Sequence, residues 1–342
     1  MGQSRPRDPS VDSFRGLMIL LVMVGHLSVV PMDADAFKWL LSGFRMPVFM
    51  ALSGYLLNIE SLRSRLFGSN VKFYALRMVI PWLFATAFFT AALKRSNALH
   101  SLENVVLYPL YHLWFVPSLI ICLLISFFVK VRATSLLFSS VAMFLLSVSM
   151  FGLYDLHPFK NADFEQLSHM IGDQRFYTMP MFFFMGAALA SMKSQVSTFL
   201  LKVASLGASI GACLWMSAFF TRDAASGIAG YILLNSGLIF VLFRGLSLAR
   251  VSIPILEAIG RQSLFFYLWH PAIFFASKET LYKVSPASLA MLATMIATVY
   301  ALFLALRWLP PTGWIATIVG IAPDNRVPLA KTSEERLRFV ST

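Results

Sequence analysis

An arginine and a histidine stand out in the otherwise apolar run "SVDSFRGLMILLVMVGHL", where they are Arg15 and His26. If the run is a helix, the two side chains share one face about 16 Å apart, because eleven residues make almost three turns. A guanidinium can hold phosphate, and an imidazole can act as a general base near neutral pH. This spacing suits a long, thin ligand with an anionic head and a reactive end, which is the shape of coenzyme A thioesters. Taken alone, Arg15 could equally be a positively charged membrane anchor.

Four titratable side chains fall inside apolar runs, namely His26, Arg45, His112 and His270. Such groups are costly in a membrane and usually face an interior cavity or one another. A single membrane histidine is often a structural hydrogen-bonding residue, but four groups at a similar predicted depth indicate a shared polar cavity. Tyr267 precedes His270 by three residues, so both can lie on one helix face, an arrangement that core packing would also produce.

The surrounding composition is that of a polytopic helical membrane protein. The chain has 342 residues, of which 58% are hydrophobic and 13% charged, and its mean hydropathy is +0.72. Repeated apolar runs of about 20 residues match the hydrocarbon core of a bilayer. We therefore predict an all-α transmembrane bundle of about ten spans, forming a single domain over residues 1–342. The predicted spans are 14–31, 37–57, 74–93, 108–129, 134–153, 176–192, 197–219, 227–247, 262–279 and 287–306.

Basic residues indicate the orientation of these spans. Most of the 28 Lys and Arg residues fall on one side of the layout, which the positive-inside rule assigns to the cytoplasm. Both termini are then cytoplasmic, and the basic tail over about 322–342 is expected to lie on anionic membrane lipid. The same rule explains the net charge of +12, and the sequence contains no nucleic-acid-binding motif. On the opposite side, the polar loop 154–175 is either a ligand-binding segment or a solvated cap.

The two cysteines, Cys122 and Cys213, both fall in predicted spans. Small apolar packing is the usual role of a cysteine in such a place. Their positions predict neither a disulfide nor a metal site.

Several segments, in this order along the chain, resemble the motifs of the acyltransferase type 3 family of membrane O-acyltransferases. The family includes polysaccharide O-acetylases and fucose 4-O-acetylase-like proteins. The first segment, "DSFRGLMILLVMVGH", has the family's arginine, ten residues and histidine at Arg15 and His26. The later segments are "FRMPVFMALSGYL", "LRMVIPWL", "YHLWFVPSLI", "MPMFFFMGAAL" and "IGRQSLFFYLWHP". The resemblance covers the chain from Asp12 to about Leu306.

The resemblance implies transfer of an acyl group, usually acetyl, from acyl-CoA to a hydroxyl of a cell-surface or exported carbohydrate. It also implies a bacterial inner membrane, a donor substrate instead of a permanently bound cofactor, and polysaccharide biosynthesis proteins as partners. The family requires the residues that match Arg15 and His26. Two positions depart from related motifs. Arg45 stands where fucose 4-O-acetylase-like members have histidine, and Tyr74 replaces the first arginine of an Arg-x-x-Arg motif, so that only Arg77 remains.

These residues together suggest a reaction. Arg15 and Arg77 hold the phosphates of the acyl-CoA, and His26 removes a proton from a sugar hydroxyl as its oxygen attacks the thioester carbonyl. An acyl-His intermediate is the alternative route. The groups expected to stabilise the oxyanion or bind the carbohydrate or lipid-linked glycan acceptor are Arg45, His112, His270 and Tyr267.

Other interpretations remain open from the sequence. Ser53 and Ser263 can be read as nucleophiles, but their surroundings favour helix packing or capping. A transporter or flippase of a glycolipid or small metabolite would also carry intramembrane cations. Such proteins often have internal repeats and broken helices, and we find neither pattern in the sequence. A non-catalytic subunit of a polysaccharide assembly complex is disfavoured because both Arg15 and His26 are present.

Overall fold

The structure is a computed structural model that describes residues 8–27, 35–92, 102–110, 112–151, 172–192, 197–246, 251–281, 287–310 and 312–322. The helices of the first half are α1 Pro9–Leu27, α2 Ala36–Leu56, α3 Ile59–Ser64, α4 Phe67–Tyr74, η2 Ala75–Val79, α5 Ile80–Ala92, α6 Leu102–Leu107, α7 Phe115–Ser126 and α8 Ala133–Phe151. Those of the second half are α10 Arg175–Ser191, α11 Thr198–Thr221, α12 Ala224–Leu246, α13 Pro254–Arg261, α14 Ser263–Leu281, α15 Ala287–Trp308 and α16 Trp314–Val319. The predicted all-α class is confirmed.

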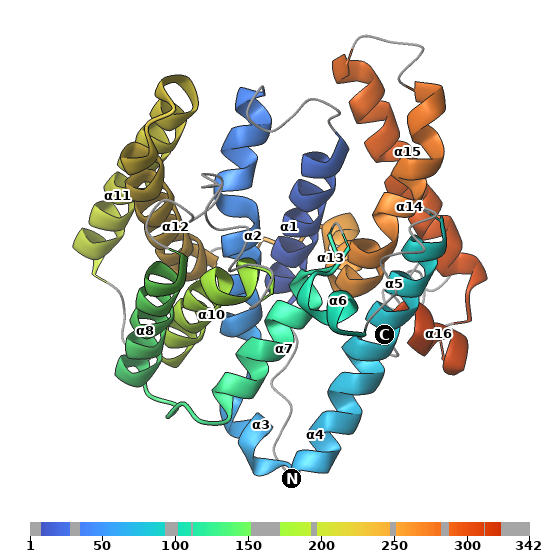
Figure 1. Ribbon diagram of the computed structural model, residues 1–342, viewed down its shortest axis with the longest axis horizontal. Coiled ribbons are helices and arrows are strands. Elements are labelled where there is room, and N and C mark those ends of the chain that lie inside the picture. Colours follow the sequence, from blue (N-terminus) through green and yellow to red (C-terminus); the bar gives the residue numbers. More distant parts are fainter. Residues whose placement is uncertain are drawn as a thin grey trace, which may run out of the picture.

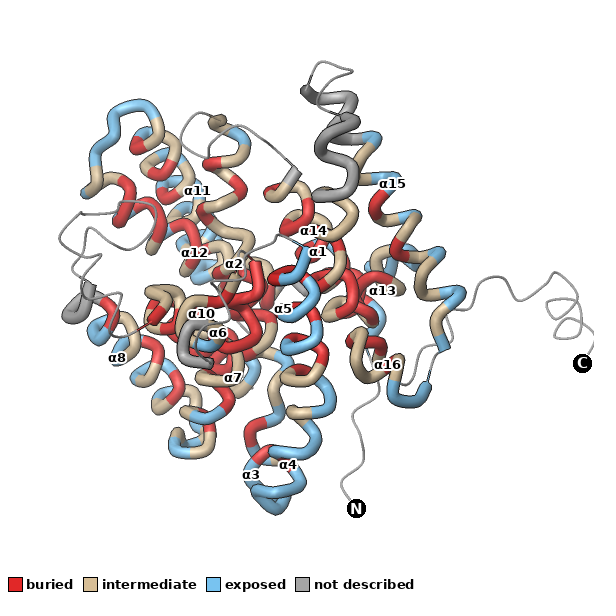
Figure 2. Tube along the Cα trace, turned by 45° about the vertical axis from the view of Figure 1, so that its right-hand side comes forward, coloured by how far each residue is buried: buried red, intermediate tan, exposed pale blue. Residues whose placement is uncertain are grey.

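The helices α1 and α2 form the middle of the bundle (Figure 1). On one side, α10 packs between α2 and α8. The hairpin of α11 and α12 lies on the same side and also packs against α2. On the other side, α14 packs against α1, α5 and α15, and α16 packs against α5. Buried residues concentrate where α1, α2, α10 and α14 meet, whereas α3 and α4 at one end are largely exposed (Figure 2).

Each of the ten predicted spans overlaps a helix of the structure. Among the described residues, three helical segments are long and apolar enough to cross a membrane by length and composition, namely Phe67–Ala92, Thr198–Thr221 and Ala224–Arg244. Several shorter apolar helices accompany them, so the number of ten crossings stays a prediction. Most of the predicted polar loop 154–175 and nearly all of the tail 322–342 lie outside the described residues, as do the last residues of the first predicted span.

Helix α13, which the hydrophobic pattern does not predict, is fastened to the start of α1. A Cβ added to Gly16 would overlap the carbonyl oxygen of Leu256, and one added to Gly260 would overlap that of Asp12. The hydroxyl of Ser13 also accepts a hydrogen bond of 3.0 Å from the N–H of Ile253, just before Pro254 opens α13. Small residues let helix backbones approach this closely. The close fit fixes the position of α13 relative to the arginine-bearing face of α1.

Side-chain hydrogen bonds connect the α11–α12 hairpin to α2. Pro47 has no N–H, so the Gly43 carbonyl four residues earlier lacks its helical donor. The side-chain amide of Asn235 donates to this carbonyl at 2.7 Å. Nearby, Trp39 and Trp215 stack with ring centroids 4.7 Å apart, and each indole N–H donates to the other's backbone carbonyl at 2.9 and 3.0 Å. These contacts hold the part of α2 that carries Arg45.

Candidate active site

A cavity of about 540 Å³ lies between α1, α2, η2, α7, α13, α14 and the end of α16. Its lining includes three arginines, namely Arg15, Arg77 and Arg261, and we call it the arginine cavity. The volume falls within the range of about 300–1,000 Å³ that is usual for small-molecule sites. Arg15 and Arg77 are the two residues predicted to bind the donor. Arg261 lies in the motif segment "IGRQSLFFYLWHP", but it was not among the residues predicted to bind the donor.

Two of these arginines are held by carboxylates of their own helices. The guanidinium of Arg15 lies 3.5 Å from the carboxylate of Asp12 on α1. That of Arg261 pairs with Glu257, one turn earlier on α13. Both arginine side chains remain about one quarter exposed, at 24% and 26%. Such pairs orient a guanidinium.

The third arginine, Arg77, lies in the π-helical turn η2. Pro81 follows it by four residues and cannot donate the hydrogen bond that the Arg77 carbonyl would accept in an α-helix. The N–H of Ile80 instead reaches back to the carbonyl of Ala75. A π-turn of this kind shifts the register of the side chains that follow, and such turns are frequent at functional sites. Hydrophobic periodicity alone does not reveal this local irregularity.

Ser53 and Ser263 also line the arginine cavity. The hydroxyl of Ser53 donates to the carbonyl of Phe49 at 3.0 Å, within its own helix. This bond fits the helix-packing role that the sequence favours for Ser53.

Three histidines that are far apart in the sequence lie close together: His26 on α1, His112 in the turn before α7, and His270 on α14. The ring centroid of His26 lies 6.3 Å from that of His112 and 5.4 Å from that of His270, and the last two are 5.5 Å apart. His112 is 3% exposed and His270 is fully buried, whereas His26 is partly exposed. We call these residues the histidine cluster. In the part of the chain that the structure describes, no side chains are grouped as a metal site would require.

His112 lies in a turn before α7, not within a helix. The predicted span 108–129 is therefore wrong at its first end, because α7 begins only at Phe115. Two side chains donate hydrogen bonds to backbone carbonyls of this turn. The indole N–H of Trp82 donates to the carbonyl of Leu113 at 2.9 Å, and the hydroxyl of Tyr267 donates to the carbonyl of His112. The His112 Nε2 lies 3.3 Å from the carbonyl of Leu268. These bonds replace the helical hydrogen bonds that the turn lacks.

The hydrogen bonding of His270 selects one imidazole tautomer. Its Nδ1 lies 2.9 Å from the carbonyl oxygen of Phe266. A carbonyl only accepts hydrogen bonds, so Nδ1 carries the proton and the neutral ring has its lone pair on Nε2. Among the described residues, the buried Nε2 has no hydrogen-bond partner. His270 therefore presents a fixed acceptor inside the cluster.

Arg45 joins the histidine cluster from α2. Its guanidinium occupies the space next to Gly25, where an added Cβ would overlap it. This contact places the charge of Arg45 one residue from His26, close enough to interact with both His26 and His270. The structure thus brings together the four titratable groups that the sequence placed at one depth.

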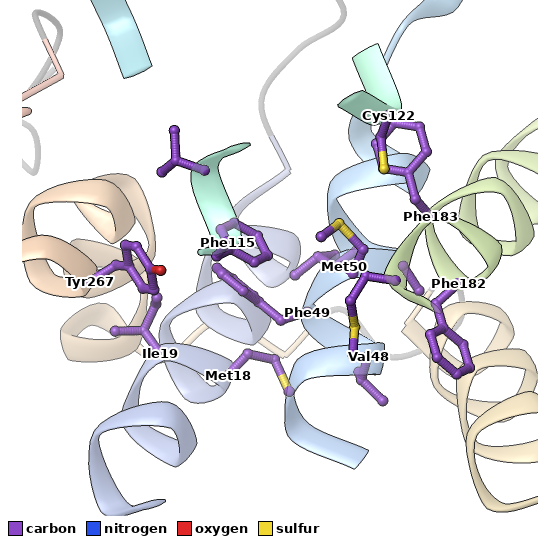
Figure 3. Packing of buried hydrophobic residues seen from close by; sticks show 14 of the residues in the cluster. Met18, Ile19, Val48, Phe49, Met50, Phe115, Cys122, Phe182, Phe183 and Tyr267 are labelled. Atoms are coloured by element: carbon purple, nitrogen blue, oxygen red, sulfur yellow. The ribbon is translucent and has the colours of Figure 1, made fainter. Parts of the chain in front are cut away.

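Three aromatic side chains, which we call the aromatic wall, line the arginine cavity, and one of them also contacts the histidine cluster. Phe49, Phe115 and Tyr267 line the cavity, whereas no histidine is among its described lining residues. The rings of Phe49 and Phe115 stack at 4.9 Å, and Phe115 lies 5.5 Å from Tyr267 (Figure 3). The ring of Tyr267 is also 5.5 Å from that of His112. Arg15 therefore lines the cavity, whereas His26 belongs to the cluster further along α1.

The helices long and apolar enough to cross a membrane indicate a membrane protein, and the polar groups buried between the helices form a candidate internal site. A family model described as an acyltransferase domain, that of the acyltransferase type 3 family, matches residues 8–308. The chain belongs to this family. The resemblance of its ordered motifs is thereby confirmed.

Two curated relatives match a shorter stretch. Nodulation protein NolL of Mesorhizobium japonicum is 40% identical over 86 residues, which cover 23% of this chain and 22% of that protein. Nodulation protein NolL of Sinorhizobium fredii is 38% identical over 94 residues, or 25% of each chain. The matched stretches thus span about a quarter of the relatives' own length. No solved structure matches the chain.

Proposed function

We propose that the protein is an integral membrane O-acyltransferase that moves an acetyl group from acetyl-CoA to a hydroxyl of a cell-surface or exported carbohydrate. The observation that carries this proposal is the arrangement of the two sites along α1. A cationic cavity of about 540 Å³ surrounds Arg15, and three histidines surround His26 further along the same helix. A donor with a phosphorylated head and a narrow acyl-bearing arm has the matching shape.

The donor is proposed to bind with its phosphates at Arg15 and Arg77. Guanidinium groups bind phosphate with paired, charge-assisted hydrogen bonds. The acyl-bearing arm then points along α1 toward the histidine cluster. To reach His26, the thioester must pass the side chains that line the cavity, among them Phe49, Phe115 and Tyr267.

In the proposed reaction, the acceptor oxygen attacks the thioester carbonyl while His26 accepts the hydroxyl proton. The new C–O bond forms, the C–S bond breaks, and the proton passes from His26 to the departing coenzyme A thiolate. Arg45 stabilises the oxyanion that develops on the carbonyl. An acyl-His26 intermediate would give the same products in two steps.

The acceptor is proposed to bind beside His112, His270 and Tyr267. The Nε2 of His270 is a buried acceptor whose tautomer is set by Phe266, so it can receive a hydrogen bond from a sugar hydroxyl. His26 is partly exposed and is not among the described residues that line the arginine cavity. This exposure gives the acceptor a route that does not pass through the arginine cavity.

The proposed setting is a bacterial inner membrane with both termini in the cytoplasm. The exposed α3–α4 end carries Arg63, Arg65 and Lys72, which the positive-inside rule assigns to the cytoplasm. The lining of the arginine cavity includes Phe73 and Tyr74 at the end of α4, and we propose that acyl-CoA enters from this side. Proteins that assemble or export polysaccharide are the proposed partners, and no nucleic acid is involved.

The test uses purified protein, its His26→Ala variant and a Cys213→Ser control, all reconstituted in lipid nanodiscs. Each is incubated with acetyl-CoA, with and without a membrane-glycan extract from the host, and thiol release and glycan acetylation are measured. Loss of both signals in the His26→Ala variant alone would support the proposal. Equal signals from His26→Ala and Cys213→Ser would remove His26 from the chemistry. In a separate assay with the unmodified protein in sealed vesicles, acceptor movement across the membrane without acetylation would point to a transporter.

A further inference from the structure

Arg261 reaches the arginine cavity through a contact that the sequence does not reveal. Gly16 and Gly260 let α1 and α13 touch backbone to backbone, and Arg261 is the last residue of α13. As a result, Arg261 lines the same cavity as Arg15, although the two are far apart in the sequence. Helix packing at this point therefore sets the spacing between two guanidinium groups.

The guanidinium of Arg261 has a carboxylate partner at one nitrogen, whereas another nitrogen has no hydrogen-bond partner among the described residues. Glu257 pairs with one terminal nitrogen, and the Ser252 hydroxyl donates to the same carboxylate at 3.3 Å. The Nε of Arg261 is buried and has no hydrogen-bond partner among the described residues. A buried donor without a partner is costly, so its N–H is expected to be satisfied when the cavity holds a ligand.

A purely structural role explains these features less well. An ion pair spaced by one helical turn on a partly exposed helix adds only a few tenths of a kcal/mol. Such a pair alone does not require the side chain to line a cavity. The close backbone contact at Gly260, in contrast, positions Arg261 with little freedom.

We propose that Arg261 is a third donor-binding arginine, and that the cavity selects a thioester of a nucleotide coenzyme with several phosphate groups. A thioester on phosphopantetheine, with a single phosphate, would leave part of this cationic lining unused. The proposal rests on the proposed function, because it assumes that the cavity holds the acyl donor. It assigns Arg261 to substrate binding, not to the chemical step.

Binding is measured by calorimetry in nanodiscs, independently of turnover. The ligands are coenzyme A, 3′-dephospho-coenzyme A and 4′-phosphopantetheine, and the proteins are the unmodified chain, Arg261→Ala and Arg261→Lys. Arg63→Ala is the matched control, because Arg63 lies on the exposed α3 and donates to the Phe127 carbonyl. Arg261→Ala should weaken coenzyme A binding by about tenfold to a hundredfold, the usual effect of losing a hydrogen bond between charged groups.

Two features of the result make it specific. Arg261→Ala should also reduce the preference for coenzyme A over 4′-phosphopantetheine, and Arg261→Lys should show an intermediate loss because it keeps the charge but not the fork. If Arg261→Ala does not fold, Arg261→Lys alone must still lose affinity. Unchanged affinities for all three ligands would overturn the role of Arg261 only. Failure of the unmodified protein to bind coenzyme A would overturn the donor assignment as well.

Discussion

The arginine cavity and the histidine cluster lie next to each other along α1, yet their side chains are supported differently. In the cavity, Arg15 and Arg261 are 24% and 26% exposed and pair with carboxylates of their own helices. In the cluster, His112 and His270 are 3% and 0% exposed, and their ring nitrogens face backbone carbonyls. The cavity thus presents two partly exposed cations, whereas His112 and His270 present buried hydrogen-bonding groups.

This difference suggests a division of roles, in which one region binds the donor and the other carries out the chemical step. A cation that already has a carboxylate partner and some water can exchange part of that environment for a phosphate at modest cost. A proton transfer gains from fixed hydrogen-bonding groups and from the exclusion of water. Substitutions in the cavity should therefore change donor affinity, and substitutions in the cluster should change the rate of the chemical step.

The largest effect after loss of His26 is expected for His270→Asn. The asparagine amide can still donate to the Phe266 carbonyl, but the acceptor at Nε2 is lost. We expect kcat for acetyl transfer to fall about a hundredfold, within the range of groups that take part in proton transfer. Coenzyme A affinity should stay unchanged. Steady-state kinetics combined with calorimetry checks both values, and a kcat equal to that of the unmodified protein would remove His270 from the site.

A complementary effect is expected for Arg15→Ala. This change removes the proposed donor to phosphate and leaves the buried carboxylate of Asp12 without the Arg15 guanidinium. The KM for acetyl-CoA should rise by about tenfold to a hundredfold, while kcat at saturating donor falls much less. Initial rates over a range of acetyl-CoA concentrations give both constants. A fall in kcat alone would contradict the division between the two regions.

Much of this arrangement could be predicted from the sequence. The spacing of Arg15 and His26 on one helix follows from helical periodicity, and α1 contains both residues. The grouping of four titratable side chains was predicted from their similar depth, because such groups are costly in lipid. Periodicity does not give the position of one helix relative to another. The structure was therefore needed to show which histidines face one another.

Other features were missed for identifiable reasons. The π-turn with Arg77 depends on the single missing N–H of Pro81, which hydropathy does not register. Helix α13 is too short to be recognised as a predicted span, so no binding role was predicted for Arg261. The turn at His112 lies in an apolar run that reads as helix, and only its side-chain donors, Trp82 and Tyr267, allow it to depart from helical geometry.

A smaller, combined effect is expected for Gly260→Ala. The added methyl group would overlap the Asp12 carbonyl and push α13 away from α1. Overpacking of this kind costs about 1–3 kcal/mol of stability. Because Arg15 and Arg261 would move apart, donor affinity should fall together with the unfolding temperature. Thermal unfolding and coenzyme A calorimetry test both, and Gly207→Ala, at a position with open space on α11, is the matched control.

The smallest functional effect is expected for Trp215→Phe, which lies in neither region. Phenylalanine keeps an aromatic ring against Trp39 but cannot donate to its carbonyl, so a buried acceptor loses its side-chain partner. Unfolding should become easier by about 1 kcal/mol, the usual net contribution of such a hydrogen bond. Both kcat and the KM for acetyl-CoA should remain those of the unmodified protein. A change in kcat here would mean that the α11–α12 hairpin acts on the histidine cluster through α2, because Trp39 and Arg45 belong to the same helix.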